Sequence, residues 1–301
     1  MERSQLKYVI EIAKYENITH AAEALHITQP SLSNQLINLE NELGISLFER
    51  SRKRVYLTEA GKHFVHHAKR ILNEFEDLSH LMQDFATEEK GSIRIGVLPQ
   101  MASLDINNLI ASFQSLNPNI QVFLREGYSS ELCSRIKESE LDICFAISST
   151  QESANNLEQI EILQVQPVAA VSKQNPLSKK KRLSLEDFRN QRIILISPDA
   201  VIHHNYLNIL DENQIPYNIV GICNQILSCF ALVEVDFGIA LCSETTSQYH
   251  NSPQIAYLPI DGFQRNKINL VFKKNPLYYP VLRSFIEYAL SYYKKDVNEI
   301  L

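Results

Sequence analysis

The spacing of apolar residues in the first sixty positions predicts three short helices. One helix is expected over 4–13, and a second begins after Asn17, a residue that favours the N-cap position. A third helix begins after Thr28, carries a proline in its first turn and ends at Gly44. Leucines recur on one face of this third helix and are expected to face a small core: Leu32, Leu36, Leu39 and Leu43.

The opposite face of the third helix carries amides and hydroxyls, where solvent-exposed helix faces usually carry Lys and Glu. Its residues are Gln29, Ser31, Ser33, Asn34, Gln35, Asn38 and Asn41. Amide side chains can form two hydrogen bonds with adenine, so this face suits a helix lying in a DNA major groove. An ordinary polar surface is the alternative, and the shortage of charged residues favours the groove-reading interpretation.

A short basic hairpin is expected after the third helix. Leu47 and Phe48 can pack against the helices, and Val55 and Leu57 alternate as in a strand. Cations lie between these two pairs: Arg50, Arg52, Lys53 and Arg54. A hairpin of this kind after a helix-turn-helix is typical of a wing that contacts phosphates or a minor groove, whereas a solvated basic turn is the simpler alternative.

Residues 59–87 are expected to form one long helix, because they contain no proline and only one glycine, near the start. Apolar residues recur in steps of four and three, which is typical of helices that pair in a coiled coil. The predicted seam consists of Phe64, Ala68, Ile71, Phe75, Leu78, Met82 and Phe85. Packing on the helix's own domain would favour a wider stripe with a longer period. We therefore expect two copies to pair through this seam and to present two DNA-reading heads to a two-fold symmetric site.

Strands and helices alternate after a polar hinge at 88–91. Strands are expected at SIRIGVL, IQVFLRE, LDICFAIS, PVAAVS, RIILIS, NIVGI, GIALC and INLVFKK. Helices are expected at 106–116, 130–137, 202–212, 225–235 and 281–293. Such alternation predicts an α/β domain with mostly parallel strands, arranged in two linked halves.

The composition fits a protein with these two parts. The chain has 301 residues, of which 45% are apolar and 21% charged, as in ordinary globular proteins. No apolar run approaches the ~18 residues of a membrane span, and the N-terminus lacks the apolar core of a secretion signal. We therefore expect a cytoplasmic protein without a membrane partner. The net charge of −6 argues against an indiscriminate nucleic-acid binder, although a local basic patch can act alone.

Metal and disulfide sites are not indicated. The 5 cysteines are scattered and lack CxxC spacing. Cys223 and Cys229 are close enough in sequence to suggest a redox switch, but their apolar surroundings favour a role as small core residues. His63 and His67 have a spacing that can hold zinc, yet no nearby carboxylate or cysteine completes a site. No cofactor is expected.

The stretch from Ala21 to Gly61 closely resembles the DNA-binding domain of LysR-type transcriptional regulators. The matching positions are Ala21, Ala22, Leu25, Gln29, Pro30, Ser33, Leu39, Glu40, Leu43, Gly44, Leu47, Phe48, Arg50, Leu57, Thr58 and Gly61. The resemblance implies a winged helix-turn-helix over 1–58 and a linker and dimerisation helix over 59–87. It implies base and phosphate contacts from the start of the third helix, supported by the wing. The family usually has arginine at position 34, so Asn34 is expected to shift base preference toward adenine. The full candidate set is Thr19, Thr28, Gln29, Pro30, Ser31, Ser33, Asn34, Gln35, Asn38, Arg50, Arg52, Lys53 and Arg54.

The rest of the chain resembles the effector domain of the same family more loosely, through RIGVLP, residues 129–148 and FGIALCSE. This likeness implies an α/β domain similar to type 2 periplasmic binding proteins, with two Rossmann-like subdomains. The first would comprise 92–163 and 268–301, and the second 168–265. A small organic anion or an amino-acid-like metabolite would bind between them. The family also implies a homodimer or homotetramer, with RNA polymerase as a further candidate partner.

Candidate effector-binding residues follow from the position of ligands in α/β units. Ligands lie at the carboxyl ends of the strands and near helix N-termini. This rule selects Pro99, Gln100, Met101, Ala102, Ser148, Ser149, Ser197, His203 and His204. The histidines would favour an anion, although paired histidines on a loop are more often solvated.

Two other classes of protein compete with an effector-controlled regulator. An enzyme or a transport protein can use the solute-binding fold, but the chain lacks a secretion signal and the HExxH, GxSxG and P-loop motifs. A constitutive DNA-architecture protein would not need a large α/β region. The sequence therefore predicts a non-enzymatic regulator that binds an interrupted palindrome of double-stranded DNA.

Overall fold

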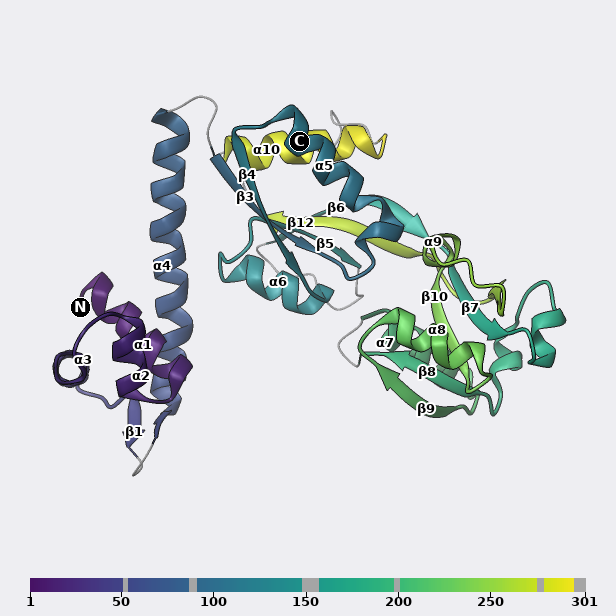
Figure 1. Cartoon of the computed structure of the whole chain (residues 1–301), viewed down its shortest axis with the longest axis horizontal. Coiled ribbons are helices and arrows are strands. Elements are labelled where there is room, and N and C mark those ends of the chain that lie inside the picture. Colours follow the sequence, from purple (N-terminus) through teal and green to yellow (C-terminus); the bar gives the residue numbers. More distant parts are fainter. Residues whose placement is uncertain (51–53, 87–90, 148–156, 198–200, 275–278, 295–301) are drawn as a thin grey trace. The chain divides into compact units, whose positions relative to one another are not determined.

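The computed structural model describes residues 1–50, 54–86, 91–147, 157–197, 201–274 and 279–294 (Figure 1). Contacts divide the chain into two compact units, Met1–Ala86 and Thr87–Leu301. Each unit has its own hydrophobic core, as expected for a domain that folds by itself.

The described part of the first unit contains four helices and a hairpin, as the sequence predicts. The helices are α1 (Arg3–Tyr15), α2 (Ile18–Ala24), α3 (Gln29–Leu43) and the long α4 (Glu59–Ala86). Between α3 and α4, strand β1 (Phe48–Arg50) pairs antiparallel with β2 (Val55–Leu57).

Caps explain where the two central helices begin and end. The Asn17 side-chain oxygen accepts hydrogen bonds from the amides of Thr19 and His20, at 2.8 and 3.2 Å. The Thr28 hydroxyl accepts one from the Ser31 amide at 3.4 Å. Gly44 ends α3 with a φ of 68°, a conformation that glycine adopts without steric cost.

Three residues of the LysR-like motif hold the hairpin against the helices. The Glu40 carboxylate accepts hydrogen bonds from the amides of Leu47 and Phe48, at 2.7 and 3.1 Å. The Thr58 hydroxyl accepts one from the Gly61 amide at 3.0 Å, at the start of α4. A Cβ atom on Gly61 would lie 2.0 Å from the Leu47 carbonyl oxygen, so only glycine fits there.

The core of the first unit lies between α1, α2, α3 and the hairpin. It buries Val9, Ile12, Ala21, Ala22, Leu32, Leu36, Leu39, Leu47, Phe48 and Val55. Leu43 was expected to belong to this core but is 38% exposed. It lies in the last turn of α3, next to Gly44, where the chain leaves the helix.

A mixed sheet forms the first half of the second unit. Its strands are β3 (Gly91–Val97), β4 (Ile120–Glu126), β5 (Ile143–Ile147), β6 (Leu157–Val165) and β12 (Asn266–Lys273), in the order β4-β3-β5-β12-β6. Strands β4 and β5 run parallel to β3, and β12 runs antiparallel to both β5 and β6. One strand in five is therefore reversed.

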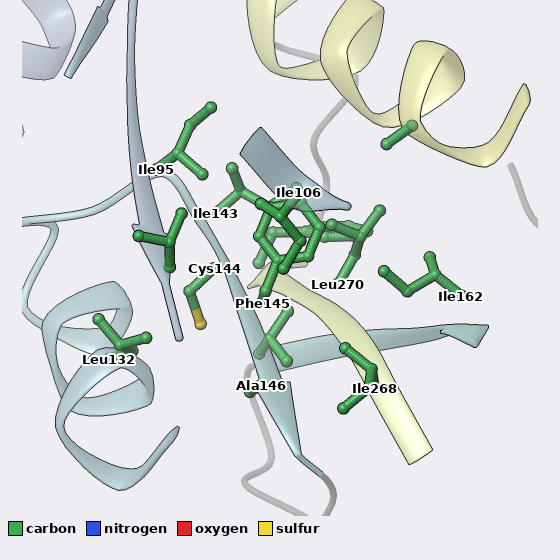
Figure 2. Packing of buried hydrophobic residues seen from close by; sticks show 14 of the residues in the cluster. Ile95, Ile106, Leu132, Ile143, Cys144, Phe145, Ala146, Ile162, Ile268 and Leu270 are labelled. Atoms are coloured by element: carbon green, nitrogen blue, oxygen red, sulfur yellow. The ribbon is translucent and has the colours of Figure 1, made fainter. Parts of the chain in front are cut away.

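Helices cover both faces of this first sheet. α5 (Ile106–Leu116) and α10 (Pro280–Tyr292) lie on one face and α6 (Ser129–Lys137) on the other, and the short η1 (Met101–Leu104) precedes α5 (Figure 1). Figure 2 shows the apolar side chains of the strands packed beneath them, among them Phe145 and Leu270. The Phe285 ring meets the Phe113 ring edge-on with centroids 5.0 Å apart.

The second sheet repeats this arrangement. Its strands are β7 (Pro167–Ser172), β8 (Arg192–Ile196), β9 (Asn218–Cys223), β10 (Ile239–Ser243) and β11 (Ile255–Pro259), in the order β11-β7-β10-β8-β9. The single reversed strand is β7. The helices are α7 (Val201–Glu212), α8 (Ile226–Glu234) and α9 (Glu244–Tyr249), with short turns η2 (Pro176–Lys179) and η3 (Leu185–Phe188).

Alternation along β7 shows that α7 and α8 cover opposite faces of this sheet. Ala169 and Val171 share a cluster with Tyr206 of α7, whereas Val168 and Ala170 share one with Phe230 of α8. The expected α/β class with mostly parallel strands is confirmed. Strands β6 and β11 and helix α9 were not predicted, because they are short or carry many polar residues.

The chain passes between the two halves twice. Gln166 separates β6 from β7, and residues 260–265 separate β11 from β12. The Asn266 side chain donates a 2.6 Å hydrogen bond to the Tyr206 hydroxyl, and both residues are buried. Burial raises the pKa of Tyr206, so this hydroxyl stays neutral and able to accept.

Candidate nucleic-acid interface and ligand cavity

The polar face of α3 is open to solvent. Gln29, Pro30, Asn34, Gln35 and Asn38 are exposed, and so are Ser31, Thr28 and Thr19. Ser33 is half-buried. Because α3 packs on its unit through Leu32, Leu36 and Leu39, the polar residues between these positions face outward. Hydrogen-bonding groups are thus displayed without any Lys or Arg on the helix.

Of the wing cations, only the side chain of Arg54 belongs to the described structure. Its Nη1 lies 3.2 Å from Glu16 Oε2, with both side chains largely exposed. Glu16 also accepts a hydrogen bond from the Val55 amide through its carbonyl oxygen, at 3.0 Å. The end of α1 and the start of β2 are therefore joined twice. Arg50 lies in β1, and its side chain, Arg52 and Lys53 are outside the described residues.

The apolar stripe on α4 divides into two parts. Ala68 is 2% exposed and packs with Leu6 of α1 and with Leu72, and Phe64 packs against the same cluster. The sequence assigned Phe64 and Ala68 to a seam between two copies. That assignment needs correction, because α1 of the same chain already covers them.

Further along α4, the stripe is open. Ile71, Phe75, Leu78 and Met82 are 43%, 49%, 53% and 51% exposed. The Arg3 guanidinium carbon lies 5.3 Å from the centre of the Phe75 ring, so α1 reaches this part only at its edge. The side chain of Phe85 is outside the described residues. His63 and His67 are exposed, and no group of three metal-ligating side chains occurs in the described structure.

A cavity of about 540 Å³ lies in the second unit. Its wall comes from the carboxyl ends of parallel strands in both sheets: Leu98 and Pro99 follow β3, Glu126 ends β4, Asn224 follows β9 and Leu241 belongs to β10. Ligands of α/β proteins bind at such positions. A cavity of this volume accommodates a small metabolite.

The residues that were predicted to bind an effector divide into three groups. Pro99 and Gln100 line the cavity. Met101, Ala102 and Ser197 are described but are not part of its described lining. Ser148 and Ser149 lie outside the described residues, and His203 and His204 lie in α7 with side chains that are not described.

Sequence reasoning missed much of the wall. Glu126, Tyr128, Ser129 and the stretch 224–227 all line the cavity. The same rule that selected Pro99 would have found them, had it been applied to the carboxyl ends of IQVFLRE and NIVGI. Thr246 of α9 was missed because that helix was not predicted.

Two helix N-termini face the cavity, one from each half of the unit. Tyr128 precedes α6 and Gln225 precedes α8, and both residues line the cavity. Neither side chain caps its helix. The first amides of a helix have no acceptor within it, and the helix dipole makes this end attractive to anions. The cavity wall is thus suited to a carboxylate or phosphate.

Side-chain charges act in the opposite direction. Within the described lining, the ionisable carboxylates are Glu126 and Glu131, and Lys, Arg and His do not occur. Arg135 donates a 2.9 Å hydrogen bond from Nε to Glu131 but also pairs with Glu140, so it offsets only part of the charge of Glu131. Glu126 and, in part, Glu131 therefore give the described wall a negative side-chain charge.

Hydrogen bonds join the two halves beside the cavity. The Tyr128 hydroxyl donates to the Asn224 carbonyl oxygen at 3.2 Å. The hydroxyls of Ser103 and Thr246 lie 3.3 Å apart. Both contacts therefore link residues of different halves of the unit.

None of the described helices is long and apolar enough to cross a membrane. Two family models match the chain. "Bacterial regulatory helix-turn-helix protein, lysR family" matches residues 4–62, and "LysR substrate binding domain" matches residues 86–294.

Curated relatives cover almost the whole chain. The uncharacterized HTH-type transcriptional regulator YybE of Bacillus subtilis is 25% identical over 98% of this chain and 100% of its own. The HTH-type transcriptional regulator AlsR of the same organism is 27% identical over 95% of this chain and 94% of its own.

A solved structure shows the same fold. CbnR, a LysR family transcriptional regulator, is 23% identical and gives a TM-score of 0.73 over 98% of this chain and 100% of its own. Full-length CbnR in complex with its target DNA is 23% identical and gives 0.72 over 97% and 99%.

Proposed function

Because the chain belongs to the LysR family of bacterial transcriptional regulators, we propose that it binds a specific DNA site through α3 and that a small molecule in the cavity controls this binding. The chain carries the family's DNA-binding helix-turn-helix and its substrate-binding domain. We propose that it acts as a regulator without catalysis, in the cytoplasm, with RNA polymerase as a further partner.

The observation that carries the DNA-binding proposal is the exposed polar face of α3. Gln29, Asn34 and Asn38 present amides that pair bidentately with adenine, and the absence of Lys and Arg on the helix leaves little charge for non-specific attachment. The similar protein CbnR has been solved in complex with its target DNA. This complex supports DNA as the partner here as well.

Because α3 carries no Lys or Arg, one DNA-binding unit alone is expected to bind DNA weakly, so we infer that two copies bind together. The open part of the stripe on α4, from Ile71 to Met82, is a surface that a second α4 can cover. We propose a dimer that reads an interrupted palindrome. The second unit also exposes apolar residues on one edge strand of each sheet, Phe123 and Leu124 on β4 and Ile219 and Ile222 on β9, which support assembly into a tetramer.

A genomic footprint of the bound protein tests the DNA-binding proposal. We expect protected sites that share an inverted repeat, and a mobility-shift titration that separates this repeat from a shuffled duplex by at least ~1,000-fold at physiological salt. Equal affinity for both duplexes would refute sequence-specific binding. A Gln29→Ala variant should reduce this ratio of affinities, whereas Glu23→Ala, at an exposed position of α2 outside the candidate set, should leave it unchanged.

The cavity favours an amino-acid-like effector over a dianion. The N-termini of α6 and α8 attract one carboxylate, and Glu126 attracts an ammonium group. The apolar remainder of the wall, which includes Leu98, Leu241 and Ile268, suits an aliphatic or aromatic body.

Calorimetric titration with three probes tests this choice. We expect L-leucine to bind more tightly than 4-methylpentanoate, which lacks the ammonium group, and more tightly than 2-isobutylsuccinate, which carries a second carboxylate. Glu126→Gln should lower the ratio of the affinities for L-leucine and 4-methylpentanoate about tenfold, or by ~1.4 kcal/mol. Tighter binding of the dicarboxylate would reject the amino-acid-like class and leave the DNA-binding proposal intact.

A further inference from the structure

Two cysteines bracket the turn between β9 and α8. Cys223 is the last residue of β9 and is half-buried, whereas Cys229 lies in α8 and is 1% exposed. The side chain of Cys223 lies close enough to Cys229 to contribute to the raised pKa of its thiol. Both thiols are free, and both residues pack in the same apolar cluster behind the sheet.

The residues between the two cysteines form part of the cavity wall. Asn224, Gln225, Ile226 and Leu227 line it in succession. The Asn224 carbonyl oxygen accepts the hydrogen bond of Tyr128 from the other half of the unit. A covalent bond between Cys223 and Cys229 would therefore close a ring around this segment of the wall.

We propose that Cys223 and Cys229 are a reversible redox pair, which closes to an intrachain disulfide when a peroxide reaches Cys223. Cys223 is the more accessible of the two, so it is the sulfur that the oxidant meets first. Its thiolate attacks hydrogen peroxide: an S–O bond forms, the O–O bond breaks and hydroxide leaves as water after taking up the thiol proton.

The second step needs only the neighbouring thiol. The sulfur of Cys229 attacks the sulfur of the sulfenic acid, so that the S–S bond forms, the S–O bond breaks and hydroxide leaves with the Cys229 proton as a second water. Two thiols and one hydrogen peroxide give one disulfide and two waters. A dithiol reductant returns both cysteines to thiols.

Burial assigns the two cysteines different roles. Desolvation, together with the adjacent Cys223, raises the pKa of Cys229 to about 12. Cys229 therefore remains a thiol that is shielded from solvent oxidants, and it reacts only with the sulfur beside it. The thiol of Cys229 also lies 3.7 Å from the Leu195 carbonyl oxygen, which holds it in the cluster.

Intact-mass measurement of the full-length protein tests the proposal. After brief treatment with hydrogen peroxide, we expect each chain to lose about 2 Da and to regain it with dithiothreitol. Peptide mapping without reduction should join the peptides of Cys223 and Cys229. Cys133→Ala, which removes another buried cysteine, should oxidise like the parent protein.

Two variants decide whether this pair is responsible. Cys223→Ser should abolish the loss of mass, and Cys229→Ala should instead gain about 32 Da on Cys223, because no resolving thiol remains. Should Cys229→Ala fail to fold, Cys223→Ser still tests the proposal, because Cys223 is only half-buried and its substitution should leave the fold intact. Loss of mass that persists in Cys223→Ser, or a bond that maps to Cys242, would overturn the proposal.

The effect on the cavity rests on the proposed function and is measured separately. Oxidised and reduced protein should differ at least threefold in affinity for the footprinted DNA site or for L-leucine. Equal affinities in both states would refute the regulatory role, while the mass measurement still decides whether the disulfide forms.

Discussion

One apolar stripe on α4 has two parts that differ in what covers them. Ala68 is buried and Phe64 half-buried against α1 of the same chain, whereas Ile71, Phe75, Leu78 and Met82 remain about half exposed. The heptad spacing is continuous through both parts. The period of a stripe therefore shows that a helix has an apolar side, but it does not show whether that side serves folding or assembly.

The largest expected effect separates these two parts directly. Ala68→Asp places an unpaired carboxylate in the contact between α1 and α4, and we expect it to destabilise the first unit by at least ~3 kcal/mol. Ile71→Asp, three residues away, should leave that unit folded. Urea titration followed by circular dichroism measures both. Comparable unfolding midpoints in the two variants would contradict the division of the stripe.

Dimerisation should depend on the open part of the stripe and not on the part that α1 covers. Phe75→Asp should disrupt the proposed dimer, and we expect the affinity for the palindromic site to fall about 100-fold, or ~2.7 kcal/mol. Sedimentation at the concentration used for binding reports the oligomeric state. Lys69→Gln is the control, because it lowers the charge of α4 by the same one unit at a position outside the stripe. An unchanged oligomer and unchanged affinity would show that the open part does not pair.

A substitution on α3 should alter the base preference of DNA binding without affecting the folding or the pairing of α4. Gln29→Ala removes a base-contacting amide, and we expect a loss of about 1–2 kcal/mol with relaxed preference at one base pair. Thermal unfolding and sedimentation should match those of the parent protein. Uniform weakening on every sequence would assign Gln29 to phosphate contact instead.

The smallest expected effect on stability concerns Arg3, which lies where the covered part of the α4 stripe meets the open part. Arg3→Ala removes the cation that α1 places over Phe75, and we expect a loss of about 0.5–1 kcal/mol in the stability of the first unit. Lys7→Ala is the matched control, since it removes an exposed cation from the same helix. Chemical unfolding distinguishes the two variants, and equal midpoints would show that the contact with Phe75 contributes nothing.

Local signals in the sequence predicted most of the elements. Asn17, Thr28 and Gly44 mark helix ends through hydrogen bonds or backbone conformations that depend on single residues, so these ends were predictable. Strand β5 is a continuous apolar run, β10 is apolar except for its last residue, and β3 places apolar residues at alternate positions, so these strands were found as well. The α/β class followed from their alternation with helices.

What the sequence could not show depends on contacts between distant segments. Ala68 lies on the seam by spacing, but its neighbour Leu6 is far away in the chain. The cavity wall joins Glu126 with residues 224–227 from another sheet, and no local pattern relates these positions. The pairing of Arg54 with Glu16, which occupies one wing cation, was equally invisible.

The short helix α1 connects these observations. At its start Arg3 touches Phe75 of α4, in its middle Leu6 packs on Ala68, and at its end Glu16 holds Val55 and Arg54 of the wing. With 13 residues it is a rod of about 20 Å. It thus connects the open part of α4 with the wing, and in the proposed dimer we expect a change in the packing of Phe75 to alter the position of Glu16 and, with it, of Arg54.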